Sequence, residues 1–206
     1  MFPSLDSILI TANELGKIVD DLKYKLLDNP NEASSKLAEV LGELGQILVF
    51  VESETISYLE IIFLPDKSNY IECRSALLRL ESGYVTIKGY EARGHCHKIT
   101  NIYDKYLDRW FSKVLDEDEA QKIKDAFNNM NAADFDMVQG IVEITQWLKK
   151  ESEEVLDMID VDSLDDANQR IKRARKDVQL ARREIVESLA RLKLLQASFI
   201  SSSQTV

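Results

Sequence analysis

Apolar residues recur along most of this chain at alternating spacings of three and four, which keeps one stripe of an α-helix on one side. The stripe predicts helices at about 5–28, 31–64, 67–93, 98–115, 117–131, 133–160 and 164–199. Pro30 and Pro65 end the first two, and none of the 141 residues after Pro65 is a proline, the strongest helix breaker. The pattern therefore predicts an all-α, antiparallel helical bundle of about six or seven helices.

The segment 164–199 carries the most regular pattern, and Asp162 or Ser163 is placed to cap its start. One heptad position holds large apolar residues and the other holds mainly small ones: Leu164, Ile171, Val178, Ile185, Leu192 and Phe199, and then Ala167, Ala174, Ala181, Ser188 and Leu195. This alternation lets a partner helix approach closely. Since only a short loop precedes the segment, we expect 133–160 to be that partner, so that 133–200 form a long C-terminal helical hairpin.

Several places are less regular. Residues 47–51 and 55–63 are rich in β-branched and aromatic side chains, which suit buried strands, but the unbroken register favours one helix. The segment 83–90 is compatible with either a short strand or a helix. We expect Gly94 to break or kink the chain. The acidic run at 116–119 is placed to begin the fifth helix, where negative charge favours the helix dipole. The asparagine-rich run at 128–131 is predicted to end it.

The composition is that of a folded domain, with 45% apolar and 30% charged residues among 206. We expect one domain over 1–200, followed at 201–206 by a flexible tail or the start of a linker. The longest strongly apolar run is far shorter than a membrane span, and the first residues lack the basic region of a signal peptide. Cys73 and Cys96 have no paired spacing. These features predict a soluble, cytoplasmic protein with reduced thiols.

His95-Cys96-His97 is the only concentrated set of metal-ligand side chains in the sequence. Residues two apart point to the same side only in an extended backbone, so His95 and His97 are weak candidates for a metal site. A polar loop or helix start is the favoured interpretation. No glutamate precedes a histidine by three residues, as di-iron bundle sites require, and no phosphate-binding glycine loop is present. We therefore predict no cofactor and no small-molecule substrate.

Six aromatic residues gather in the middle of the chain: Tyr84, Tyr90, Tyr103, Tyr106, Trp110 and Phe111. A stripe of this kind is more often hydrophobic core than a binding surface for a cofactor, because each ring buries a large apolar area. We expect these rings in the core, with hydrogen-bond partners for any buried tyrosine hydroxyl.

Charge is distributed unevenly around the net value of −10. Residues 151–166 contain eight acidic side chains and no basic one, whereas 170–183 contain seven basic side chains and one acidic. Residues 1–163 carry a net charge of −14, and 164–206 carry +4. If the chain turns near 161–162, Arg170 and Arg173 lie opposite Glu153 and the neighbourhood of Glu151, where they are expected to form cross-helix ion pairs.

The basic residues of the last helix divide into two groups by heptad position. Three arginines flank the predicted seam and are expected to be structural: Arg170, Arg175 and Arg182. Four residues point outward and are the predicted contact surface for a partner: Lys172, Arg173, Lys176 and Arg183.

These features favour a non-catalytic protein–protein interaction module, with an adaptor, regulatory or oligomerising role, over an enzyme. The predicted partner is another protein, or a second copy of the chain in a homo-oligomer. The alternative hypothesis is binding of an anionic membrane or a nucleic acid through the same four outward residues, although the net negative charge disfavours general nucleic-acid binding. A metal-dependent enzyme built on His95 and His97 is the least favoured hypothesis.

Overall fold

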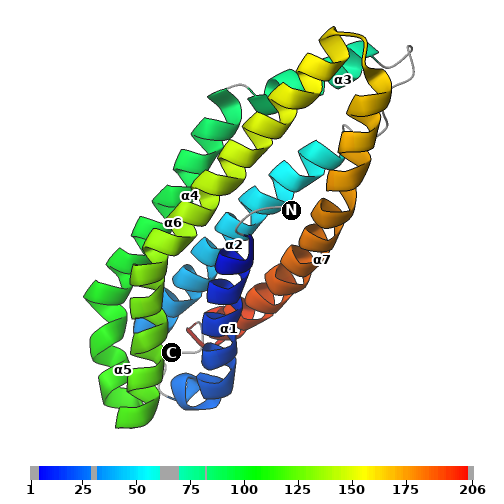
Figure 1. Cartoon of the computed structure of the whole chain (residues 1–206). Coiled ribbons are helices and arrows are strands. Elements are labelled where there is room, and N and C mark those ends of the chain that lie inside the picture. Colours follow the sequence, from blue (N-terminus) through cyan, green and yellow to red (C-terminus); the bar gives the residue numbers. More distant parts are fainter. Residues whose placement is uncertain (1–4, 29–31, 61–69, 82, 204–206) are drawn as a thin grey trace.

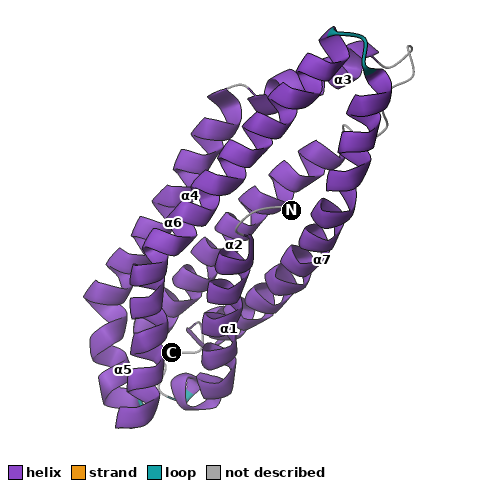
Figure 2. Cartoon of the chain, viewed as in Figure 1, coloured by secondary structure: helices purple, strands orange, loops and turns teal. Residues whose placement is uncertain are grey.

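The computed structural model describes the backbone of residues 5–28, 32–60, 70–81 and 83–203. Within these ranges the side chains of 5–7, 55–60, 70, 73, 81, 83–86, 128–138 and 202–203 lie outside the description. The elements are helices throughout the described ranges (Figure 2). They are α1 (Leu5–Leu27), α2 (Glu32–Glu60), α3 (Tyr70–Glu81), α4 (Gly83–Ile102), a π-helical turn η1 (Tyr103–Leu107), α5 (Asp108–Val114), α6 (Glu117–Asp160) and α7 (Leu164–Ser203). The predicted all-α bundle is confirmed.

The helices form an elongated bundle in which α6 and α7 meet at a turn and then diverge, with α1 and α2 between their far halves (Figure 1). The residue at the turn that takes a left-handed backbone is Asp162, with a φ of 61°. Aspartate tolerates this conformation better than most residues. At the other end of the bundle, Lys25 near the end of α1 pairs with Asp116 at 3.4 Å and with Glu119, at the start of α6. The end of α1 therefore lies beside the start of α6, and the two helices run antiparallel.

The principal partner of α7 is α2, which runs antiparallel to it. The side-chain amide of Gln196 donates to the carbonyl oxygen of Ala38 at 3.1 Å, and Arg182 lies 3.9 Å from Glu52 further along both helices. A Cβ atom on Gly42 would lie only 2.5 Å from Nε2 of Gln196. Glycine at this position leaves room for the Gln196 side chain that bonds across to Ala38.

The prediction that 133–160 would be the main neighbour of α7 is wrong, because α7 contacts α2 far more extensively than α6, which diverges from α7 beyond the turn that joins them (Figure 1). Chain proximity fixes only the turn. Beyond it, α7 packs where it can bury apolar surface over its whole length. On α2 the residues that meet α7 include Ala38, Gly42 and Glu52, and a neighbouring row of leucines is buried in the core: Leu37, Leu41, Leu44 and Leu48.

The predicted heptad stripe of α7 is confirmed as its inner face. Its large positions from Ile171 onward are buried, and so are Ala167, Ala181, Ser188 and Leu195. The small positions admit α1 beside α2, because the hydroxyl of Ser188 donates to the side-chain oxygen of Asn13 at 2.9 Å. The inner face of α7 therefore packs against two helices at once.

The segment left open between helix and strand, 83–90, is helical and begins α4. The break expected at Gly94 does not occur, because α4 continues to Ile102. Gly89 is the glycine in this helix that packing requires. A Cβ atom there would lie 2.9 Å from Oγ1 of Thr145, so its absence lets α4 approach α6.

The aromatic prediction holds for only part of its set. Tyr103, Trp110 and Phe111 are buried, with the Tyr103 ring stacked on Phe127 at 4.3 Å between centroids. Tyr90 is 63% exposed and Tyr106 is 40% exposed, and the side chain of Tyr84 lies outside the described residues.

The π-helical turn explains the exposure of Tyr106. In it, the backbone N–H of Asp108 donates to the carbonyl oxygen of Tyr103, five residues back. This spacing adds one residue to the turn, so Leu107 takes the buried place that a regular helix would give to Tyr106. The stripe after the turn is displaced by one residue.

The helices predicted at 117–131 and 133–160 are one continuous helix, α6. Asparagine lowers helix propensity by less than about 1 kcal/mol relative to alanine, so the run at 128–131 does not end a helix packed on its neighbours. The expected start is confirmed. The side chain of Asp116 accepts from the backbone N–H of Glu119 at 3.0 Å, and the Glu119 side chain accepts from the backbone N–H of Asp116 at 3.4 Å.

The end of α7 also differs from the prediction. The helix continues to Ser203, so the first half of the expected tail at 201–206 is helical. Residues 204–206 lie outside the described residues.

A pair of leucines tests the packing of α7. Leu192 is 2% exposed and would contact any side chain added at Gly16, whereas Leu194 is 73% exposed. We expect Leu192→Ala to lower the free energy of unfolding by about 2–5 kcal/mol, because it leaves a cavity among α1, α2 and α7. Leu194→Ala should change it by less than about 0.5 kcal/mol. Urea denaturation followed by circular dichroism measures both, and equal effects would contradict the assigned inner face.

Candidate functional site

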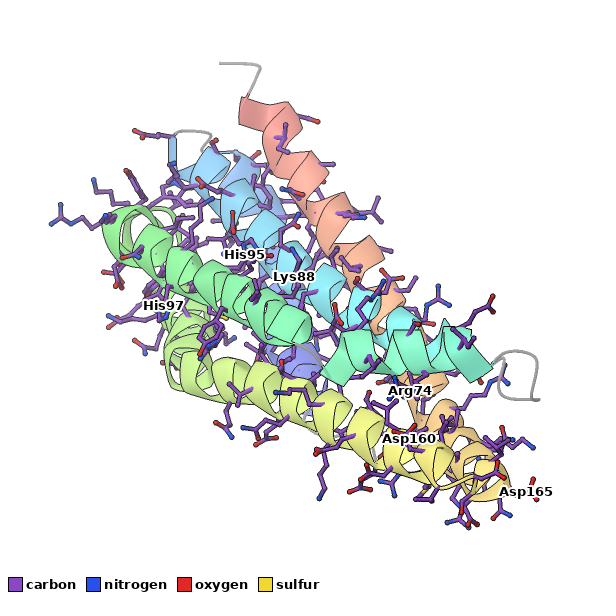
Figure 3. All side chains as sticks on the ribbon, turned by 90° about the horizontal axis from the view of Figure 1, so that it is seen from above. Arg74, Lys88, His95, His97, Asp160 and Asp165 are labelled. Atoms are coloured by element: carbon purple, nitrogen blue, oxygen red, sulfur yellow. The ribbon has the colours of Figure 1, made fainter. Side chains whose placement is uncertain are left out.

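The two histidines proposed as a weak metal site point to different sides of α4. His95 and Lys88 lie on the side of α4 that faces α2, and His97 lies away from them (Figure 3). The cause is that 95–97 are helical, and residues two apart in a helix are about 200° apart around the axis. Cys96 is buried between them, and its thiol lies 3.8 Å from the carbonyl oxygen of Ala92. It is a core residue.

His95 belongs to a chain of ion pairs between α2 and α4. Its Nδ1–H donates to the Glu43 carboxylate at 2.5 Å, and Lys98 donates to the other oxygen of Glu43 at 2.6 Å. Lys98 also pairs with Glu39 at 3.0 Å, and Glu39 pairs with Lys36 at 3.0 Å. Lys36 and Lys98 hold the pKa of the Glu39 carboxyl below its usual range by their hydrogen bonds to it. This series of ion pairs joins α2 to α4 and gives His95 a structural role.

Within the described ranges, no group of three or more histidine, cysteine, aspartate or glutamate side chains is arranged to hold a metal ion. The prediction of a metal site at His95 and His97 is therefore not supported by their placement.

The four outward residues of α7 lie where the heptad pattern placed them. Lys172, Arg173, Lys176 and Arg183 are all exposed, and they occupy one side of the helix over three turns, about 17 Å. We call this surface the cationic strip. In the part of the chain that the structure describes, the first three have no ion pair, and Arg183 pairs with Glu187 on the same helix at 3.0 Å. An exposed pair of this kind contributes little to stability.

Of the arginines expected to flank the seam, two make contacts between helices. Arg170 makes a two-pronged ion pair with Glu151 of α6, at 2.8 and 2.7 Å, and also contacts Glu154. Arg182 approaches Glu52 of α2 instead of α6. Arg175 is exposed and has no ion pair with another described residue, so its predicted structural role gains no support. The cross-helix ion pair predicted for Arg173 is wrong, because Arg173 is also exposed and pairs with no described residue.

A second feature, absent from the sequence predictions, is a groove of about 330 Å³ between α2 and α4. It is lined from α2 by Gln46, Val49, Phe50, Ser53 and Glu54, and from α4 by Lys88, Glu91, Ala92 and His95. Phe50 and Ala92 are buried apolar residues, and Val49 is partly exposed at the rim. We call this the α2–α4 groove.

Glu54 is the unusual residue of the α2–α4 groove. It is only 3% exposed, and its Oε2 atom is buried without a hydrogen-bond partner among the described residues. Burial raises the pKa of the Glu54 carboxyl, because desolvation disfavours the charged form, while the positive charges of Arg79 and Lys88 oppose the rise. The sequence does contain a signal that Glu54 is buried. Glu54 follows Ile47 and Val51 at helical spacing, so it occupies the buried stripe of α2.

Comparison with known proteins gave no matching family model and no significant match to a curated protein or to a solved structure. Among the described helices, none combines the length and apolar character that crossing a membrane requires.

The raised pKa of Glu54 predicts how stability depends on pH. The folded chain holds this proton more tightly than the unfolded chain does, so the contribution of Glu54 to stability falls as pH rises through its folded-state pKa. Glu54→Gln removes this loss. We expect the variant to gain stability over the wild type as pH rises from about 4 towards neutral, by about 1.4 kcal/mol for each unit by which the pKa is raised.

Urea denaturation at a series of pH values measures this difference. Glu153→Gln is the matched control for the loss of one carboxylate, because Glu153 is exposed on α6, and the gain should be specific to Glu54→Gln. If the free energy of unfolding of the wild type rose relative to that of Glu54→Gln as pH increases, the raised pKa of Glu54 would be contradicted.

Proposed function

We propose that this chain is a non-catalytic interaction module that binds a short acidic segment of a partner protein through the cationic strip of α7. The observation that carries the proposal is the arrangement of Lys172, Arg173 and Lys176. They are exposed on one side of a packed helix, and no described residue forms an ion pair with them. A helix held on its inner face presents these charges at fixed spacing.

The contrast with the other arginines of α7 supports this assignment. Arg170 and Arg182 contact acidic side chains of neighbouring helices, so the fold itself accounts for them. The residues of the cationic strip make no such ion pair with a described residue of a neighbouring helix. An acidic ligand would complete the charge pattern, with each contact weakened by salt because the surface is exposed.

The apolar surroundings of the strip favour a protein over a lipid surface or a nucleic acid. Leu180 is 60% exposed and lies on the same side of the helix as Lys176 and Arg173. Interfaces between proteins combine such an apolar contact with flanking charges. The net charge of −14 on residues 1–163 repels extended polyanions, whereas a short peptide contacts only the strip.

We place this activity in the cytoplasm. Cys96 is a buried free thiol, which is the expected state in a reducing compartment. Binding of an anionic membrane or of nucleic acid through the same strip is the competing function.

Charge reversal tests the proposal. The strip variant carries Lys172→Glu, Arg173→Glu, Lys176→Glu and Arg183→Glu. The matched control carries Lys105→Glu, Arg109→Glu, Lys113→Glu and Lys122→Glu, which changes the net charge equally at exposed residues of η1, α5 and α6. We expect both to fold. A capped, fluorescent acidic peptide with one leucine should bind the wild type and the control with similar affinity. Its affinity for the strip variant should be lower by at least about tenfold.

Three parallel measurements decide between ligand classes. Fluorescence anisotropy with the peptide should show affinity that falls with ionic strength. Vesicles containing phosphatidylserine and a fluorescent oligonucleotide should bind more weakly than the peptide. Stronger binding of either one, lost in the strip variant only, would replace the proposal with the competing function. If the strip variant and the control bound the peptide with equal affinity, the cationic strip would not be the binding surface.

A further inference from the structure

The Oε2 atom of Glu54 is an acceptor without a donor. It is buried and makes no hydrogen bond with any residue that the structure describes, and Glu54 lines a groove that opens between two helices. A buried polar atom without a partner destabilises a fold, so such atoms are rare and call for an explanation. A ligand that enters the α2–α4 groove with a hydrogen-bond donor would satisfy it.

The remaining charges of the α2–α4 groove already have partners. Lys88 donates to Glu91 at 2.6 Å, and His95 donates to Glu43 at 2.5 Å. Each of these pairs joins a positive or hydrogen-bond-donating group to a carboxylate. Glu54 is therefore the lining carboxylate that lacks a hydrogen-bonded partner, which favours a cationic ligand over an anionic one.

The shape and lining of the α2–α4 groove restrict the cation further. Within the described chain no set of side chains is arranged for a metal ion, and the two carboxylates of the groove do not form one. Phe50, Ala92 and Val49 provide an apolar surface beside Glu54. A volume of about 330 Å³ is at the small end of ligand sites, enough for an alkyl chain with one polar head.

We propose that the α2–α4 groove binds a protonated alkylamine, with its ammonium group against Glu54 and its alkyl chain against Phe50 and Ala92. Ser53 and Gln46 line the same groove and offer further oxygen acceptors to the ammonium protons. The ligand is either a free alkylamine or the side chain of a lysine that a partner protein inserts. This site is distinct from the cationic strip on α7 and does not depend on it.

The ionisation of Glu54 gives the proposal a pH dependence. Arg79 and Lys88 are the charged groups that act on this carboxyl from α3 and α4, and they lower its pKa, whereas burial raises it. An ammonium ion binds the charged carboxylate and not the neutral acid. Affinity for the amine is therefore expected to rise with pH through the pKa of Glu54, while the amine itself stays protonated.

Nuclear magnetic resonance titration of the ¹⁵N-labelled chain with n-pentylammonium tests the site. We expect saturable shifts of the amide signals in residues 46–54 and 88–95. The neutral probe n-pentanol, which has the same alkyl chain, should bind about tenfold more weakly. A short capped peptide with one lysine and its Nε-acetylated form separate the two sources of the ligand. Binding of the lysine peptide alone would assign the site to a partner protein.

Three variants decide whether Glu54 carries the binding. Glu54→Gln keeps the shape of the side chain and should lower the affinity for n-pentylammonium at least about tenfold. Val49→Lys places a tethered ammonium at the partly exposed rim and should compete with the ligand, without burying a charge in the core. Glu153→Gln should bind as the wild type does. The proposal would be overturned if Glu54→Gln bound n-pentylammonium as tightly as the wild type does, or if n-pentanol bound as tightly as n-pentylammonium. It would also be overturned if neither n-pentylammonium nor the lysine peptide gave saturable shifts.

Discussion

The close antiparallel packing of α2 against α7 is the constraint on which the rest of the structure depends. Gly42 leaves room for the Gln196 side chain that bonds to the Ala38 carbonyl oxygen, and Arg182 meets Glu52 further along the same two helices. Asn13 of α1 contacts Ser188, so the inner face of α7 packs against both α2 and α1. Its outward face is then left exposed, and the cationic strip lies on that face. The proposed interaction surface is a consequence of this packing.

Much of this arrangement was predictable from spacing alone. A heptad stripe depends only on which residues share one side of a helix, so the inner face of α7 was predictable without its partner. The pair between Arg170 and Glu151 was also predictable, since both lie within three turns of the hairpin turn. The partner of α7 beyond that turn was not. It is decided by how much apolar surface distant helices offer, which local spacing does not measure.

The candidate sites show the same division. The four residues of the cationic strip follow from helical periodicity. The α2–α4 groove does not, because it depends on two helices that are far apart in the sequence. The π-helical turn escaped prediction since a single added residue displaces the stripe while Tyr106 and Leu107 both fit an apolar position. For His95 and His97 the uncertain part was the backbone. Whether their side chains share a side depends on whether it is extended or helical, and the break expected at Gly94 does not occur.

Crosslinking of α7 to its neighbours tests the central claim most directly. In a background with Cys73→Ala and Cys96→Ala, one variant carries Glu52→Cys with Arg182→Cys, and the other carries Gln139→Cys with Arg182→Cys. The first pair joins α2 to α7 where their side chains meet, and the second joins α6 to α7 where a full-length hairpin would place them. A short bis-maleimide should crosslink the first pair efficiently within one chain and leave the second largely unreacted. Preferential crosslinking of the second pair would contradict the α2–α7 packing.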